Sequence, residues 1–163
     1  MRRSRWVALT FAAVAAASAA VGALRPVTVL EIENTGRERT IRIALGPGAA
    51  FSVTSHHSMY EEPVTEEFVV DRAGRIVLTA VSSPSAAVRE YFGIIAAGER
   101  HALTRAMPEV VFRIAAGEPQ RLRVAGGPER SFLELGEHGD RLVMRAGRAP
   151  AKEISAGGCG TAR

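Results

Sequence analysis

The sequence contains very little cysteine. Cys159 is the only cysteine among 163 residues, so no disulfide can form within the chain and the core must be held by packing. Aromatic residues make up 6% of the chain, and no basic stripe is interleaved with them, so nucleic-acid binding is not expected. The chain also lacks a repeat of solenoid length and a long heptad pattern, which excludes repeat arrays and coiled coils.

Much of the positive charge is concentrated at the N-terminus. The net charge is +4, and Arg2, Arg3 and Arg5 precede an uncharged, alanine-rich run from Val7 to Leu24. A basic segment followed by an apolar run and small residues predicts a secretory signal peptide over residues 1–24. Removal of this segment would leave a net charge of +1, so the basic character is mostly a targeting feature.

The alternative to cleavage is an uncleaved membrane anchor over residues 7–24. This run is close to the minimum length for crossing a bilayer, and its many alanines favour cleavage over retention. No cysteine lies directly after the run, which excludes a lipoprotein anchor. Both alternatives place the rest of the chain in the periplasm or outside the cell, with membrane contact only through the N-terminal segment if it is retained.

Short β-branched and alternating runs, separated by glycine and proline, dominate residues 25–147. The expected strands cover residues 27–34, 39–45, 51–57, 64–71, 75–81, 109–114, 120–125, 131–135 and 141–145. The first two of these runs predict one hairpin and the last two predict another. This pattern predicts a single mostly-β domain over residues 25–147, an antiparallel β-sandwich or small barrel with one short helix. An α+β fold is the alternative.

The region between Pro84 and Pro108 is not strand-like. Ser83 or Ser85 is a suitable N-cap for a short helix over residues 86–95, and residues 98–108 are expected to form a loop that carries His101. Residues 148–163 are rich in alanine, glycine and serine and are expected to form a flexible tail.

One stretch gathers histidine and carboxylate side chains between two expected strands. Strand alternation places His57 on the apolar face of residues 51–57, and it places Glu66 on the apolar face of residues 64–71. An antiparallel pair joined by a loop centred near Glu61 and Glu62 would bring His57 opposite Glu66. The candidate site residues are therefore His57, Ser58 and Glu66.

Four interpretations of these three residues remain open. The favoured one is a cross-strand latch that fixes register, since a buried ionised group needs a partner. The second is a pocket for a small ligand, such as an organic acid, or for a partner peptide. A metal site is disfavoured because His56 and His57 point to opposite faces of a strand. Catalysis, as in a hydrolase using His57 and Glu66, is disfavoured because no Gly-x-Ser-x-Gly elbow is present. We expect no enzyme activity, catalytic residue, metal or cofactor.

This stretch resembles the domain-of-unknown-function 1850 family of small exported bacterial proteins. The resemblance depends on His57-Ser58, Pro63, Glu66 and Phe68, and it continues into the strand-like run from Gly74 to Thr79. It departs from the family at Glu61, where a basic residue is common, and at residues 83–88, where a glycine-rich segment is usual. The resemblance implies an accessory role beside the membrane subunits of TRAP-type tripartite solute transporters, and it implies no catalytic activity.

Overall fold

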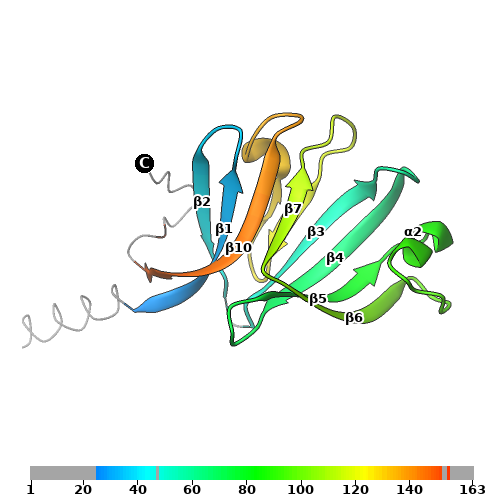
Figure 1. Cartoon of the computed structure of the whole chain (residues 1–163), viewed down its shortest axis with the longest axis horizontal. Coiled ribbons are helices and arrows are strands. Elements are labelled where there is room, and N and C mark those ends of the chain that lie inside the picture. The colour runs from blue at the N-terminus through cyan, green and yellow to red at the C-terminus, as the bar shows by residue number, and fades with distance from the viewer. Residues whose placement is uncertain (1–24, 47, 152–153, 155–163) are drawn as a thin grey trace, which may run out of the picture.

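The computed structural model describes residues 25–46, 48–151 and 154 (Figure 1). The expected signal peptide or anchor over residues 1–24 and the tail segment with Cys159 lie outside the described residues. Within the described part of the chain, no helix has the length and apolar character that crossing a membrane requires.

Two antiparallel sheets make up the domain. Sheet A has the strand order β2-β1-β10-β7, with β1 (Pro26–Asn34), β2 (Arg39–Ala44), β7 (Glu109–Arg113) and β10 (Arg141–Pro150). Sheet B has the strand order β6-β5-β4-β3-β8-β9, with β3 (Ala50–His57), β4 (Glu62–Val70), β5 (Ile76–Ser82), β6 (Arg100–Met107), β8 (Arg121–Val124) and β9 (Glu129–Ser131). The sheets do not close into a barrel, so the predicted antiparallel β-sandwich is confirmed.

Two short helices lie between strands in the described part of the chain. The predicted helix is shorter than expected, because α2 covers Ala86–Tyr91 and Gly93, with a φ of 79°, follows it. A 3-10 helix, η1, covers Phe132–Glu134. In Figure 1, sheet A stands to one side, while β4, β5 and β6 extend away from it toward α2.

Apolar side chains from both sheets meet in one core. Alternation along each strand brings every second residue to the inner face, which is why short β-branched runs suffice to build it. Phe51 and Phe68 lie in the middle of the part of the core that sheet B forms. Their ring centroids are 4.9 Å apart. Other buried members of the same cluster include Leu30, Ile32, Ile41, Val53, Ile76, Leu78, Leu122, Phe132, Leu142 and Met144.

Several expected elements differ from the observed ones. Residues 100–107 form the edge strand β6 rather than a loop, because an edge strand pairs on one side only and shows a weaker apolar pattern. Residues 131–135 do not form a strand paired with 141–145. Ser131 instead caps η1 through a capping box with Glu134, and β10 pairs with β1 and β7.

The domain also extends beyond its expected C-terminal boundary. Strand β10 continues to Pro150, three residues past the boundary expected at 147, because β1 provides a pairing partner along its whole length. The flexible tail therefore does not begin at residue 148. Pro26 pairs with Pro150, so the start of β1 and the end of β10 lie side by side.

A polar node joins the end of β1 to the loop before β10. The Asn34 side chain is buried, and its Nδ2 donates to Asp140 Oδ2 at 2.7 Å and to the Leu135 carbonyl at 3.4 Å. Asp140 also accepts from the Glu137 backbone N–H and from Arg37 Nε, and the hydrogen bonds from Glu137, Asn34 and Arg37 together lower the pKa of Asp140 to about 2. A Cβ at Gly136 would collide with the Asn34 amide. The close approach of the Asn34 side chain to the backbone of residue 136 therefore requires glycine at that position.

We expect Asn34→Ala to lower the free energy of unfolding by about 1–3 kcal/mol, because it leaves buried partners without their hydrogen bonds. Urea denaturation at neutral pH measures this change. Thr35→Ala, one residue away and exposed, is the control and should change stability by less than about 0.5 kcal/mol. Equal effects of the two variants would contradict a stabilising role for the node.

Candidate functional site

The pairing of β3 with β4 places His57 opposite Glu62 and Val53 opposite Glu66. The prediction that His57 faces Glu66 is therefore wrong. Glu66 lies four residues beyond the partner of His57 along β4, a separation of about 13 Å at the rise of a β-strand. A latch made by direct contact between the two side chains is not formed.

Two features set the observed register. Phe51 pairs with Phe68, so their rings stack in the core, whereas the expected register would have placed Phe51 opposite Arg72. The turn between the strands also closes earlier than expected. The backbone N–H groups of Tyr60 and Glu61 both donate to the His57 carbonyl, and Glu61 has a φ of 53°.

His57 and Glu66 nevertheless share one face of sheet B. The shift in register is four residues, and an even shift leaves every side chain on its original face. Phe51, Val53 and Phe68 lie on that same face and are buried in the core. The two site residues therefore point toward the space between the sheets.

A cleft of about 820 Å³ opens there, between the inner face of sheet B and the edge strand β7. All three predicted site residues line it, although they do not form one hydrogen-bonded group. The lining also includes Ser55, His56, Val64, Tyr91, Phe92, Arg105, Gln120 and residues 110–116.

Glu66 is the group in this cleft whose ionisation is most altered. Its side chain is largely withdrawn from water, and no hydrogen bond or ion pair joins it to any described residue. Burial alone raises the pKa of Glu66 to about 7, because a desolvated carboxylate is costly without a nearby cation. The carboxyl group is therefore partly protonated at neutral pH.

Aromatic rings form the rim of the cleft around His57. The His57 ring stacks on Tyr60 at a centroid distance of 5.1 Å and meets Tyr91 edge-on at 4.5 Å. Tyr91 is 63% exposed at the end of α2, so it belongs to the rim rather than to the core. Val88 is the residue of α2 that is buried.

The start of α2 is fastened to sheet B, which fixes the position of Tyr91. The buried Ser83 hydroxyl donates to the Pro63 carbonyl at 2.7 Å, and Ser85 caps the helix by accepting from the Val88 N–H. Arg89 Nη1 donates to the carbonyls of Ser83 and Pro84. One side of the rim is thus tied directly to strand β4.

Of the remaining polar residues discussed above, Ser58 lines the cleft, and His101 and His138 lie elsewhere. Ser58 is exposed in the β3–β4 turn and lines the cleft. His101 Nε2 lies 2.8 Å from the Gly98 carbonyl, and His138 Nδ1 lies 2.7 Å from the Ala115 carbonyl. No group of three or more metal-ligating side chains is found among the residues that the structure describes.

Arg105, which is not among the candidate residues predicted from the sequence, lines the cleft from strand β6. Arg105 pairs with Leu78, whose side chain is in the core, so Arg105 also lies on the inner face of sheet B. No carboxylate or carbonyl group of the described residues is bound to its guanidinium. If residues 100–107 had been predicted as a strand, its alternation would have placed Arg105 on the inner face as a candidate site residue.

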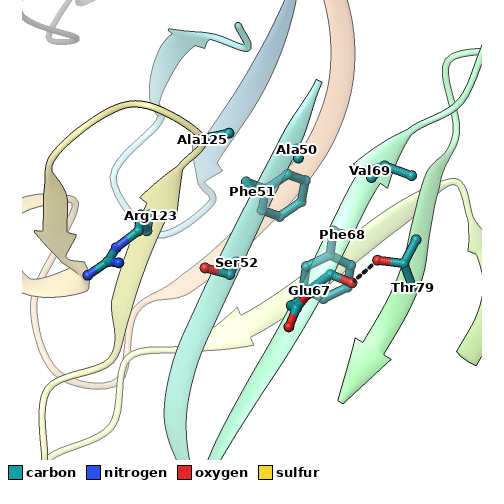
Figure 2. Close-up of a pocket in the computed structure, with 9 residues that line it drawn as sticks. All are labelled: Ala50, Phe51, Ser52, Glu67, Phe68, Val69, Thr79, Arg123 and Ala125. Atoms are coloured by element: carbon teal, nitrogen blue, oxygen red, sulfur yellow. Dashed lines mark hydrogen bonds between the residues drawn. The ribbon is translucent and has the colours of Figure 1, made fainter. Parts of the chain in front are cut away.

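A smaller depression on sheet B is a weaker candidate. It has a volume of about 240 Å³, and Figure 2 shows three of its polar lining residues, Ser52, Glu67 and Arg123, on three neighbouring strands. Glu67 is already bound by Arg100, and Arg123 lies 3.4 Å from Glu129. Its charged groups are therefore paired within the protein, unlike those of the inter-sheet cleft.

No family model, curated protein or solved structure matches this chain. The resemblance to the domain-of-unknown-function 1850 family stays a prediction.

Stability should fall as pH rises through the ionisation of Glu66. Its pKa of about 7 in the folded state exceeds the ordinary value of 4.5, so the folded protein binds more protons between these values. The stabilisation that depends on neutral Glu66 is fully present below about pH 4.5. It is lost as pH rises through 7, and the free energy of unfolding falls by up to about 3 kcal/mol. Urea denaturation at pH 5, 6, 7 and 8 measures this decline.

Glu66→Gln removes the ionisable group and should abolish that decline. Glu67→Gln is the matched control, because Glu67 is adjacent but is bound by Arg100, which lowers its pKa. The Glu67→Gln protein should keep the decline between pH 5 and 8. Parallel profiles for wild type and Glu66→Gln would contradict this assignment.

Proposed function

We propose that this protein binds a small organic acid in the inter-sheet cleft and acts as a binding protein rather than an enzyme. The observation that supports this proposal is the presence in one cleft of two polar groups without hydrogen-bond partners among the described residues, the Glu66 carboxyl and the Arg105 guanidinium. Buried polar groups are normally hydrogen-bonded, so the unpaired Glu66 carboxyl suits a ligand. Arg105 is exposed, so its guanidinium is accessible to the same ligand.

Arg105 provides the anion-binding group. A guanidinium presents several N–H donors in a plane and pairs with a carboxylate through two parallel hydrogen bonds. Arg105 lies on the inner face of sheet B and keeps access to solvent, so a ligand can reach it.

Glu66 provides a second, proton-dependent contact. When protonated, its carboxyl group donates a hydrogen bond to an acid ligand, and when ionised it repels the ligand's negative charge. Because burial raises the pKa of Glu66 to about 7, affinity for an acid should fall as pH rises through neutrality.

The walls of the cleft favour a ligand with an apolar body. Val64, Val110 and Phe112 line it with aliphatic and aromatic surface, and His57 and Tyr91 contribute rings at the rim. A mostly apolar cavity with a few polar groups is the usual form of a small-molecule site.

The hydrolase alternative receives less support from this geometry. A histidine and a carboxylate acting together need to lie within hydrogen-bonding reach, directly or through one water. His57 and Glu66 lie on strands whose register separates them by four residues. The accessory role beside a TRAP-type transporter, implied by the family resemblance, remains a proposal, and ligand binding in the cleft does not depend on it.

Screening by thermal shift at pH 6, followed by calorimetric titration of the best acid, tests the proposal. We expect saturable binding of at least one small carboxylic acid. Arg105→Ala should weaken it by about tenfold or more, the usual effect of removing a charged hydrogen-bond donor. Wild-type affinity should fall between pH 6 and 8, and Glu66→Gln should bind with little pH dependence.

Arg141→Ala is the matched control, because Arg141 is an exposed arginine on β10 that does not line the cleft. It removes the same charge and should leave the affinity within about twofold. A protein that melts normally but shows no shift with any acid would overturn the proposal. Equal weakening by Arg105→Ala and Arg141→Ala would also overturn it.

A further inference from the structure

A second inter-sheet cavity lies at the other end of strand β4. It has a volume of about 420 Å³ and is lined by residues of the β4–β5 turn and by the paired ends of β1 and β10. The residues that carry the argument below are Thr28, Asp71, Arg72 and Arg148. None of them belongs to the cleft that holds Glu66.

Two exposed arginines line this cavity from different sheets. In the β1–β10 pair, Thr28 is opposite Arg148, and the next inner pair is Leu30 opposite Ala146. Leu30 is fully buried in the core, so Thr28 and Arg148 also lie on the inner face of sheet A. Arg72 enters from the β4–β5 turn of sheet B.

The positive charge of these two arginines is not balanced within the described part of the protein. Neither Arg72 nor Arg148 has a hydrogen-bond or ion-pair partner among the described residues. Arg75, in the same turn, is paired differently, because its Nε donates to Asp71 Oδ2 at 2.9 Å. The cavity therefore contains two unpaired guanidinium groups.

Asp71 does not neutralise them. Its Oδ1 accepts from the backbone N–H groups of Ala73 and Arg75, each at 2.9 Å, while Arg75 occupies Oδ2. These hydrogen bonds lower the pKa of Asp71, so the carboxylate stays ionised and engaged within its own turn. The net charge presented to a ligand by these groups is positive.

We propose that this second cavity binds a phosphate group. A phosphate carries up to two negative charges and several acceptor oxygens, which suits guanidinium groups that approach from two walls. The Thr28 hydroxyl lines the same cavity and has no hydrogen-bond partner among the described residues, so it provides a third donor. The phosphate belongs either to a soluble compound or to the head group of an anionic phospholipid.

Titration of the full-length protein with inorganic phosphate, followed by NMR of arginine Nε–H resonances, tests the proposal. Phosphate should shift the resonances of Arg72 and Arg148 saturably. Arg72→Ala and Arg148→Ala should each weaken binding by about tenfold, and Arg141→Ala should leave it within about twofold. Arg141 also lacks a side-chain partner among the described residues and lies at the other end of the same strand, β10.

Sedimentation with vesicles identifies the source of the phosphate. If the ligand is a head group, phosphatidylglycerol vesicles should retain wild type and Arg141→Ala better than the Arg72→Ala, Arg148→Ala double variant. Phosphate binding with equal vesicle retention of all three proteins indicates a soluble phosphate compound. Absence of saturable phosphate binding, or equal weakening by all the arginine variants, would overturn the proposal. Neither result bears on the acid-binding cleft, where Arg105 is the tested residue.

Discussion

The stacking of Phe51 on Phe68 is the contact on which the site's geometry depends. It joins the middle strands of sheet B at a ring separation of 4.9 Å and fixes which residues of β3 and β4 are neighbours. Because both rings lie in the shared core, the same contact also fixes how sheet B packs against sheet A. His57 is thereby carried to the rim of the cleft, and Glu66 is carried to its inner wall.

The two cavities arise from the same property of a sandwich. Each is lined by residues of both sheets, so each lies where sheet A and sheet B face each other. Polar residues belong to both linings, Glu66 and Arg105 in the larger cleft and Arg148 in the second cavity. Polar side chains between the two sheets are therefore the common feature of both proposed sites.

Charged groups on sheet A are paired with one another across its strands. Arg145 on β10 binds Glu33 on β1 and Glu109 on β7, so a row of ion pairs crosses sheet A. Such exposed pairs contribute little stability each. Arg72, Arg105 and Arg148 have no ion-pair partner among the described residues and each lines a cavity, whereas Arg141 also has no such partner but lines neither cavity.

The sequence alone determined the fold class, most strand positions and the face on which each candidate residue lies, because a period of two residues specifies faces directly. It did not determine that His57 pairs with Glu62, because shifting a strand by four residues preserves every face. Nor did it identify β6, whose one-sided pairing leaves a weak pattern, and Arg105 was missed with it. Only the tertiary structure decided these points, since register and edge pairing depend on contacts between residues far apart in the chain.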